Sequence, residues 1–347
     1  MSVACGTDAD ALTRGLGFDC HDVAPVVSVR FPWALAHWTM PLLELLIVGG
    51  AVFALVHAVR RYRAGDPINL ALWWASLVYL FVTEPPLYFP EWFGLDRLYG
   101  FIFAHNQFTV QFMADRLPLY IVAFYPAFSQ LAYELVRSLG VFRSRGPFAG
   151  SVAVAFVCQV FYEVFDQLGP QLRWWAWNPG NRIVNHPALA AVPMTSMLLF
   201  ASVSFGALTY LVVRLAGGPR RGWPLVLRTL VAGVLTPPTM AIAGIPSSLF
   251  DGNTAVQAWI LGAELALVWV AGAWIIVTNR SERPPQSAFV RIYPAVYLGA
   301  LAVFWVGALA GDAGGPIGSG PYALACFAAA GLVLVALYRK ARAPAPV

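Results

Sequence analysis

The stretch FYEVFDQLGPQLRWWAWNPGN, residues 161–181, begins as the end of an apolar helix and finishes as an aromatic loop. The apolar run starts near residue 149, so it is long enough to cross about 30 Å of hydrocarbon at about 1.5 Å per residue. Glu163 and Asp166 nevertheless stand about one helical turn apart inside this run. The stretch therefore predicts a membrane helix that carries acids and leads into a structured loop.

Apolar blocks of the same kind recur along the whole chain, which is 59% hydrophobic and only 11% charged. A soluble domain carries about twice that share of charged residues. We therefore expect an all-α, polytopic integral-membrane helix bundle with about nine transmembrane helices. The expected spans are 35–58, 68–84, 118–137, 149–168, 188–213, 224–248, 255–278, 290–310 and 320–338.

The arginines set the expected orientation. Arginine-rich segments follow every second span, and the positive-inside rule places all of them in the cytoplasm. The N-terminus is then outside and the C-terminus is cytoplasmic. Residues 1–34 are an extracytoplasmic tail, 35–338 a single transmembrane domain and 339–347 a cytoplasmic tail. Because Lys340 is the only lysine beside 21 arginines in an alanine-rich chain, we interpret the protein as bacterial and located in the plasma membrane.

Two outer loops, 85–117 and 169–187, are long, aromatic and of mixed charge. Within the first, residues 98–112 are apolar but too short to span, so we expect a short interfacial or re-entrant helix there. The polar N-terminal tail contains Cys5 and Cys20. An extracytoplasmic tail would allow a disulfide between them, although sequence alone cannot set the required geometry.

Acids inside the spans are the strongest functional signal, because each costs on the order of 2.5–3.5 kcal/mol to insert. Most lie toward the outer side, and only Glu134 lies near an inner end, where Arg137 is expected to pair with it. Gln159, Glu163 and Asp166 follow an i, i+4, i+7 spacing that places them on one helix face. The outer acids are Glu44, Glu84, Glu163, Asp166 and Glu264.

This pattern predicts an outward-side pocket with acid and base groups. Two close, desolvated carboxyl groups resist ionising together, so one can deliver a proton and the other can accept one. We expect Asp166 and Glu163 as the catalytic pair, with Glu84 as a third acid and Glu44 and Glu264 in support. The expected aromatic walls, which can stabilise a cation, are Trp174, Trp175, Trp177 and Tyr162. The groups expected to orient water or a polar head are His105, Asn178 and Arg173.

Simpler structural roles stand beside these functional ones. Tryptophans at a membrane interface are commonly anchors in an aromatic belt. A single acid near a helix end can snorkel to water or cap the helix. Pro237 and Pro238 lie in the middle of the sixth span, and two consecutive prolines predict a kink or an unwound segment. Such a break lines a cavity in many transporters, or it is a kink required by packing.

Missing motifs narrow the chemistry further. No span contains a lysine that could form a retinal Schiff base, and no phosphate-binding or dinucleotide fingerprint occurs. The five histidines have no metal-binding spacing, so we expect neither a metal nor another cofactor. The arginines lie at the ends of spans and form no single patch, so we expect no nucleic-acid partner.

The opening stretch also resembles a known family. The sequence EVFDQLGPQLRWWAWNPG, followed by HPALAAVPMTSMLLF, is similar in layout to the integral-membrane carotenoid-biosynthesis hydratases of the bacterioruberin pathway. In that family an acid-bearing helix leads to a Trp-x-Trp signature, and a Val-Pro stretch opens the next span. The resemblance implies addition of water to a terminal double bond of a long isoprenoid, without a soluble cofactor. The matching positions are Asp166, Trp175, Trp177, Val192 and Pro193.

Three functions fit these residues. The first is a membrane enzyme that hydrates, isomerises or cyclises an isoprenoid, carotenoid-like or other lipid substrate. The second is a proton-coupled transporter in which the buried acids bind protons and the Pro237–Pro238 break forms the site. An inverted repeat would favour the transporter, and we recognise none. The third is a non-catalytic subunit whose loops 85–117 and 169–187 dock membrane-protein partners.

The orientation can be tested by labelling single cysteines with a membrane-impermeant reagent in whole cells. Because the loop after the first span is rich in arginine, Gly65→Cys should be protected, whereas Gly180→Cys in an outer loop should react. Permeabilised cells, in which both positions should react, are the control. Reaction of Gly65→Cys in intact cells would contradict the predicted orientation.

Overall fold

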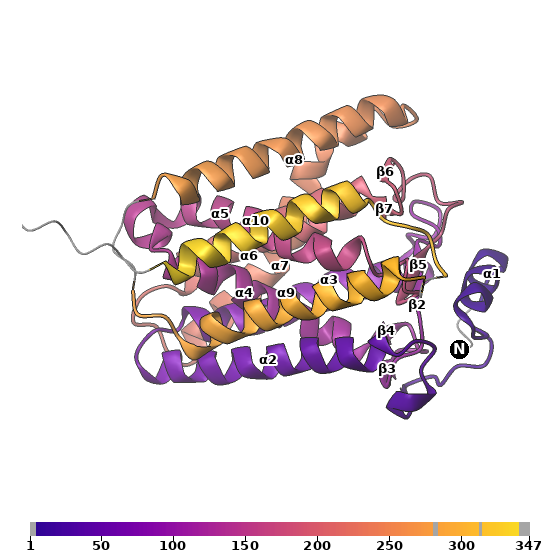
Figure 1. Ribbon diagram of the computed structural model, residues 1–347, viewed down its shortest axis with the longest axis horizontal. Helices are drawn as coiled ribbons and strands as arrows, with labels where there is room; N and C mark the ends of the chain where they lie inside the picture. Colours follow the sequence, from indigo (N-terminus) through magenta and orange to yellow (C-terminus); the bar gives the residue numbers. More distant parts are fainter. Residues whose placement is uncertain (1–4, 280–283, 312–313, 340–347) are drawn as a thin grey trace, which may run out of the picture.

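The computed structural model describes residues 5–279, 284–311 and 314–339. Over these residues the protein is a bundle of long helices, with strands and a short helix, α1 (Thr7–Leu16), gathered at one end (Figure 1). Nine helices of the described part are long and apolar enough to cross a membrane. The all-α class and the number of spans agree with the sequence prediction. The expected cytoplasmic tail from Lys340 onward lies outside the described residues.

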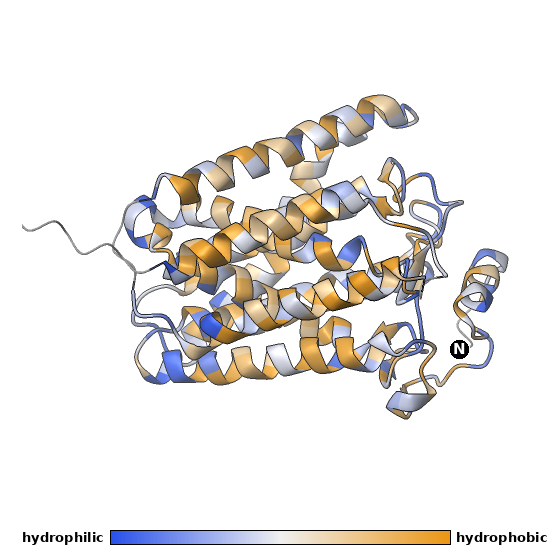
Figure 2. Ribbon diagram, in the orientation of Figure 1, coloured by the Kyte–Doolittle hydropathy of each residue, from blue (hydrophilic) through white to orange (hydrophobic). Residues whose placement is uncertain are grey.

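The long helices are apolar along their length and hydrophilic mainly toward the two ends of the bundle (Figure 2). The arginine-rich segments that follow α2, α4 and α6 lie at one end, which we call the arginine end, while α1 and the strands lie at the other, the cap end (Figure 1). The predicted sorting of the loops into two groups is therefore present, whereas the side of the membrane that each end faces stays a prediction. The helices are α2 (Thr39–Arg63), α3 (Ile68–Tyr88), α4 (Leu119–Ser138), α5 (Val141–Asp166), α6 (Ser204–Ala216), α7 (Trp223–Ser248), α8 (Thr254–Val277), α9 (Ala288–Leu309) and α10 (Gly320–Tyr338).

Helices α4 and α5 form the centre of the bundle and are its most buried spans. Helix α5 packs against α4, α6, α8 and α10. Two glycines allow the close approach. A Cβ on Gly206 of α6 would lie 3.0 Å from the Ser151 carbonyl oxygen, and one on Gly272 of α8 would lie 2.2 Å from the Phe156 Cβ. Small residues at helix contacts are a common means of tight packing in membranes.

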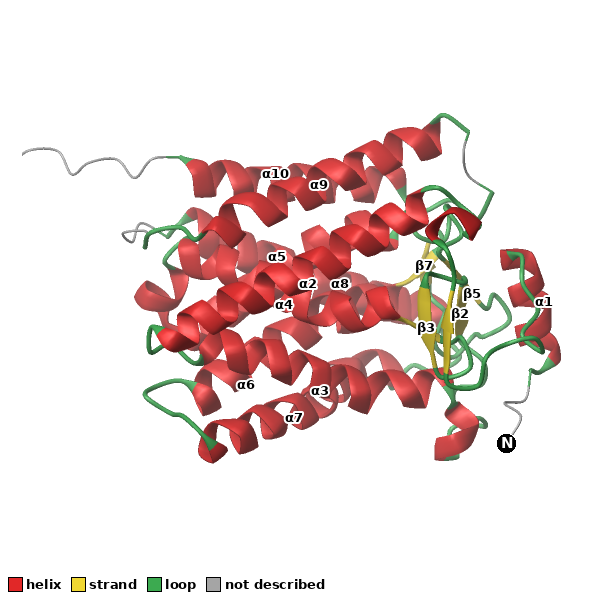
Figure 3. Cartoon of the chain, turned by 90° about the horizontal axis from the view of Figure 1, so that it is seen from below, coloured by secondary structure: helices red, strands yellow, loops and turns green. Residues whose placement is uncertain are grey.

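Short antiparallel strands connect the loops at the cap end, between the helix ends and α1 (Figure 3). Strands β1 (Val27–Val29), β3 (Val110–Phe112) and β4 (Leu117–Pro118) form one sheet, and β2 (Phe103–His105) pairs with β5 (Trp175–Trp177). A third pair joins β6 (Ala188–Leu189) to β7 (Val192–Pro193).

The expected helix over residues 98–112 is therefore wrong. Two strands, β2 and β3, occupy its second half, and each finds its partner in a different part of the chain. Partners distant in sequence supply the hydrogen bonds that a short helix would have supplied internally. Hydropathy identified this segment as apolar but could not reveal those partners.

Some helix boundaries also differ from the expectation. Residues 188–193 form the β6–β7 hairpin, and helix begins only after it, with the π-helical turn η3 (Ser196–Val203) before α6. Helix α3 continues through Pro85 and Pro86 to Tyr88, so the two prolines do not end it at the expected residue 84. Helix α5 contains a break at Gly146, whose φ is 77°, so its membrane part starts close to the expected residue 149.

Helix α7 is continuous through Pro237 and Pro238, so the expected unwound segment is wrong. The hydroxyl of Thr236 donates to the Ala232 carbonyl at 2.9 Å, and the hydroxyl of Thr239 donates to the Thr236 carbonyl at 2.6 Å. The prolines remove the amide donors of the Gly233 and Val234 carbonyls, so these hydroxyl bonds are additional contacts to neighbouring carbonyls. Pro238 is exposed on the outside of the bundle.

A buried ionic network joins α2, α3 and α4 toward the arginine end. Glu134 accepts two hydrogen bonds from Arg137, to Oε1 at 2.7 Å and to Oε2 at 2.8 Å. The expected pairing of these two residues is confirmed. His57 Nε2 lies 3.2 Å from Glu134 Oε2, and Asn69 Nδ2 donates to Glu134 Oε1 at 2.8 Å. The carboxylate therefore has polar neighbours from three helices.

Removing the cation of this network should destabilise the bundle. Arg137→Met leaves Glu134 buried without its bidentate partner, so the free energy of unfolding should fall by about 3–5 kcal/mol. The measurement is a denaturation curve in detergent. The double variant Glu134→Leu/Arg137→Met is the matched control, and it should lose clearly less stability because no unpaired charge remains. Equal losses in the single and double variants would contradict this interpretation.

Candidate functional site

A cavity of about 80 Å³ lies at the cap end, between the ends of the helices and the β2–β5 pair. This is room for several water molecules, at roughly 10–15 Å³ for each. Its wall is mainly apolar and aromatic, and no lysine or arginine of the described residues lines it. Six of the sequence-predicted site residues meet here, and they are Glu84, His105, Tyr162, Asp166, Trp175 and Trp177.

Two carboxyl groups line this cavity. Glu84 comes from the last turn of α3, and Asp166 is the final residue of α5. They are 7% and 3% exposed, respectively. The Tyr125 hydroxyl donates a hydrogen bond to Glu84 Oε1. The Ser196 hydroxyl donates to Asp166 Oδ2 at 3.3 Å. Each acid is thus held by a hydroxyl from a neighbouring helix, which fixes its side chain without neutralising it.

The three tryptophans have two different roles, because β5 is a strand and successive side chains point to opposite faces. Trp175 and Trp177 are two residues apart and line the cavity. Trp174 is fully buried elsewhere, where its Nε1 donates to Thr39 Oγ1 at 2.9 Å and its ring stacks on Phe165. The expectation of Trp174 as a pocket wall is therefore wrong. Its indole instead ties the start of α2 to the loop.

The position of Trp175 depends on a glycine. A Cβ on Gly169 would lie 1.9 Å from the indole of Trp175, so any other residue would displace this ring. The ring also packs against Phe165, with centroids 4.9 Å apart. Gly169 and Phe165 therefore define where the aromatic wall stands relative to Asp166.

His105 lies opposite Trp175 in the β2–β5 pair. Its Nδ1 is 3.1 Å from the Tyr120 hydroxyl. Burial lowers the pKa of His105 to about 3, because the desolvated imidazole disfavours its charged form. The ring is therefore neutral at ordinary pH, with one nitrogen as donor and the other as acceptor. Such a group can orient water without adding charge to the cavity.

Asparagine side chains hold the two loops together behind the cavity. Asn106 Nδ2 donates to the Arg173 carbonyl at 2.8 Å, and Asn178 Nδ2 donates to the Phe101 carbonyl at 2.9 Å. Asn181 and Asn185 make equivalent bonds to the carbonyls of Tyr99 and Ile102. The expected role of Asn178 in orienting a ligand is thus not supported, because this side chain is used to connect the loops.

Several other predicted site residues lie away from the cavity wall. Glu44 accepts hydrogen bonds from Thr109, from the amide at 3.1 Å and from the hydroxyl at 2.6 Å, so it anchors the loop before β3. Arg173 donates to the Gly314 carbonyl at 3.1 Å. Glu264 is half-buried on α8. The residues outside the cavity wall are Glu44, Glu163, Glu264, Arg173, Trp174, Asn178, Pro237 and Pro238.

Glu163 stands one turn behind Asp166 and is fully buried. Its Oε2 accepts a hydrogen bond from Gln167 Nε2 at 3.0 Å, while its Oε1 has no hydrogen-bond partner among the described residues. Gln167 Oε1 in turn accepts from the Ser319 amide at 2.8 Å. Glu163 therefore faces the start of α10, and Glu84 replaces it as the second acid of the cavity.

No match links this chain to a known protein. No protein-family model, no curated protein and no solved structure matches it. The resemblance to carotenoid hydratases described above therefore stays a prediction. Val192 and Pro193 of that resemblance are buried in β7, and Pro193 lines the cavity.

The partners of the two acids are not predictable from the sequence. Tyr125 lies inside an apolar span and Ser196 in a run of ordinary span residues, so neither had a distinguishing neighbour in sequence. Ser196 is also the first residue of η3, and π-helical turns are frequent at functional sites. The only available signal was the short polar group Thr195–Ser196 directly after the Val-Pro stretch.

A second cavity of about 40 Å³ adjoins the first and shares Tyr88, Phe103 and His105 with it. Its wall is completed by α1 and by the segment that follows it, including Phe18 and Cys20. This N-terminal cap, residues 5–26, is attached through Asn106, whose Nδ2 donates to the Leu16 carbonyl at 3.3 Å. His105 therefore stands between a cavity under the cap and the cavity that contains the acids.

The low pKa of His105 predicts a loss of stability in acid. Below a pH of about 6.5 the unfolded chain protonates this histidine, whereas the folded protein does so only near pH 3. Protonation of His105 therefore costs the folded protein nothing above about pH 6.5. Below that pH it lowers the free energy of unfolding by up to about 1.4 kcal/mol per pH unit. His105→Gln should therefore lose less stability than the wild type between about pH 7 and pH 5.

Denaturation in detergent at the two pH values is the measurement. His186→Gln, at a histidine in the same group of loops but outside both cavities, is the control and should keep the wild-type slope. A His105→Gln slope equal to that of the wild type would contradict a buried, neutral imidazole.

Proposed function

We propose that the protein is an integral-membrane enzyme that acts by acid–base chemistry on an isoprenoid or another apolar lipid. The observation that supports this proposal most is the meeting of Glu84 and Asp166 in one apolar, aromatic cavity that no lysine or arginine of the described residues lines. Ionising both would place two like charges in a site that solvates neither, so at least one acid keeps its proton. A protonated acid beside an ionised one is the arrangement that general acid–base catalysis needs.

The reaction that fits is the addition of water to an alkene. Asp166 gives its proton to the less substituted carbon of the double bond, and the π electrons form the new C–H bond. The neighbouring tertiary carbon becomes a cation, which the faces of Trp175, Trp177 and Phe165 stabilise. Water then forms a C–O bond with that carbon, and its surplus proton passes to the Glu84 carboxylate. Return of a proton from Glu84 to Asp166 through cavity water restores the pair.

The same cation has a second outcome. If Glu84 removes a proton from the adjacent carbon, a new double bond forms and the product is an isomer of the substrate. The choice depends on whether water reaches the cation. The cavity under the cap adjoins the acids at His105, and a neutral imidazole there can orient a water molecule. This arrangement favours hydration over isomerisation.

A long substrate would enter the cavity through the less buried part of its wall. Leu87, Val184, Thr195 and Phe200 are half-buried, whereas the acids and Trp175 are buried. These four residues come from the end of α3 and from the segment that leads into α6. The end group of an isoprenoid would fill the cavity, and the remaining chain would leave between these two segments toward the lipid.

The transporter alternative has less support. It required a broken helix at Pro237 and Pro238, whereas α7 is continuous there and Pro238 faces outward. The acids also do not form a chain of sites across the bundle, because Glu134 near the arginine end is held in an ion pair with Arg137. We therefore propose the enzyme as the function.

Substitution of either cavity acid should abolish turnover in a folded protein. Asp166→Asn and Glu84→Gln keep the side-chain shape but cannot transfer a proton, so each should lower the rate by about 10²–10⁴-fold. The assay uses purified protein in liposomes that contain lycopene, a linear isoprenoid, in ¹⁸O-labelled water. The product is measured by mass spectrometry as a gain of labelled water.

Glu44→Gln is the matched control, because Glu44 is a buried acid at the same end that binds Thr109 and lies outside the cavity. It should retain turnover, although it should be less stable by about 1 kcal/mol for the weakened hydrogen bonds. A thermal midpoint for each variant separates lost chemistry from lost folding. Full turnover by folded Asp166→Asn would overturn the catalytic assignment, and no conversion by the wild type would overturn the hydration of this substrate class.

A further inference from the structure

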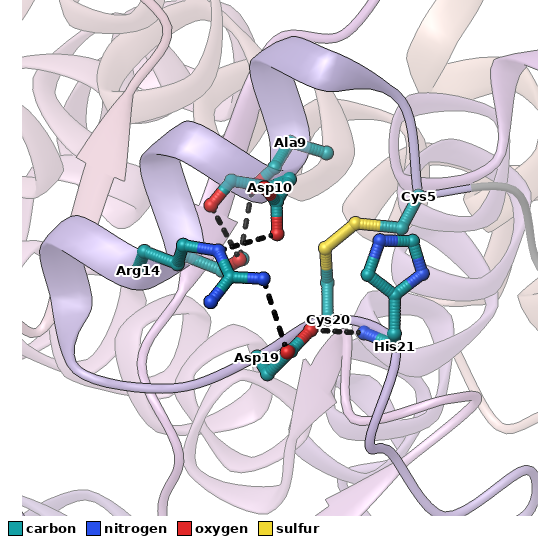
Figure 4. Close-up of a disulfide and its surroundings, with 8 residues drawn as sticks. Cys5, Ala9, Asp10, Arg14, Asp19, Cys20 and His21 are labelled. Carbon is teal, nitrogen blue, oxygen red and sulfur yellow. Dashed lines mark hydrogen bonds and ion pairs between the residues drawn. A yellow bond between two sulfur atoms is a disulfide. The ribbon is translucent and has the colours of Figure 1, made fainter.

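The N-terminal cap carries a group of side chains that the cavity chemistry does not use. A disulfide joins Cys5 to Cys20 and closes the cap around α1 (Figure 4). His21 follows Cys20 directly, and its imidazole lies beside the sulfurs. Asp10 stands on the neighbouring turn of α1. Within the described residues, one ligand atom each from Cys5, Asp10, Cys20 and His21 lies within 4.8 Å of the other three.

The donor atoms of this group suit a zinc ion. Two sulfurs, one imidazole nitrogen and one carboxylate oxygen are ligands that Zn²⁺ accepts in a tetrahedral site. Imidazole and thiolate together select borderline-soft divalent ions over magnesium or calcium, which prefer oxygen. Four different side chains also satisfy the usual coordination number of a structural zinc site.

The backbone geometry allows either a disulfide or a metal ion. The Cα atoms of Cys5 and Cys20 are 5.9 Å apart. Two thiolates at about 2.3 Å from a tetrahedral zinc would place their sulfurs about 3.8 Å apart. Rotation of the two cysteine side chains can provide that separation without a large backbone movement. The same two segments can therefore be connected by a covalent bond or by an ion, but not by both.

The ligands of this group already have orienting partners. Arg14 Nε donates to Asp10 Oδ1 at 2.8 Å, which leaves Asp10 Oδ2 for another interaction. Arg14 Nη2 also lies 3.2 Å from Asp19 Oδ2, and Asp19 Oδ1 accepts a hydrogen bond from the His21 amide at 2.8 Å. These contacts fix the carboxylate of Asp10 and the backbone at His21.

We propose that the cap binds Zn²⁺ through Cys5, Asp10, Cys20 and His21 when its disulfide is reduced. Reduction by a dithiol transfers two electrons and two protons, so that the S–S bond breaks, two thiols form and the dithiol becomes a disulfide. Binding of zinc then releases the two thiol protons to solvent. Because Cys20 also lines the cavity under the cap, the ion would keep this wall closed in place of the disulfide.

Zinc binding by the purified full-length protein in detergent tests this proposal. One sample is oxidised and the other is reduced with a dithiol, which is then removed under argon. Both are dialysed against Zn²⁺ and analysed for metal. The reduced protein should retain about one Zn²⁺ per chain, and the oxidised protein should retain none at this site. Cys20→Ser and His21→Ala should weaken binding by the reduced protein by at least about 10-fold.

The double variant Cys158→Ser/Cys326→Ser is the matched control, because these buried cysteines lie in α5 and α10, away from the cap, and it should bind zinc like the wild type. If a cap variant fails to fold, folded wild type whose reduced cap thiols are alkylated with iodoacetamide replaces it and should not bind zinc. Reduced protein without zinc would overturn the proposal. Binding that survives Cys20→Ser, His21→Ala or alkylation would overturn it as well.

Discussion

The pairing of Phe103–His105 with Trp175–Trp177 is the constraint on which the cap end depends. Both strands have three residues, and a pair this short has little stability of its own. Asparagine side chains supply the missing hydrogen bonds between the same two loops, with Asn185 donating to the Ile102 carbonyl at 2.7 Å. Once the strands are paired, alternation along β5 places Trp175 and Trp177 on the cavity side. The aromatic wall is therefore a result of strand register.

The hydrogen-bond partners of each buried acid determine its role. Glu134 has a bidentate arginine and becomes part of an ion pair, whereas Glu44 is occupied by the amide and hydroxyl of Thr109. In the part of the chain that the structure describes, Glu84 and Asp166 are held by hydroxyl groups and face a common cavity. A carboxyl group with a full set of donors is fixed in one charge state. The two that lack such donors can exchange a proton, which is why the proposed chemistry is assigned to them.

Hydropathy predicted the nine long helices well, because each helix satisfies its backbone hydrogen bonds internally and needs only an apolar run. The same signal failed for residues 98–112, where the partner strands lie far away in sequence. Helical spacing correctly placed Glu163 and Asp166 on one side of α5. It could not show that Gln167 and the start of α10 lie against Glu163, while Ser196 lies against Asp166. Side-chain partners between helices depend on packing, which no local pattern encodes.

The wide turn η3 sets the direction in which Ser196 points. In a π-helix each hydrogen bond spans one residue more than in an α-helix, so such a turn corresponds to a helix that contains one extra residue. Loss of a single residue from this turn would restore regular α-helical winding and rotate everything before it by about 100° relative to α6. Ser196 would then leave Asp166, and the β6–β7 hairpin would turn as a unit relative to α6. A change in chain length at this turn would therefore disturb the cavity as a whole, whereas a single substitution acts on one part of its wall.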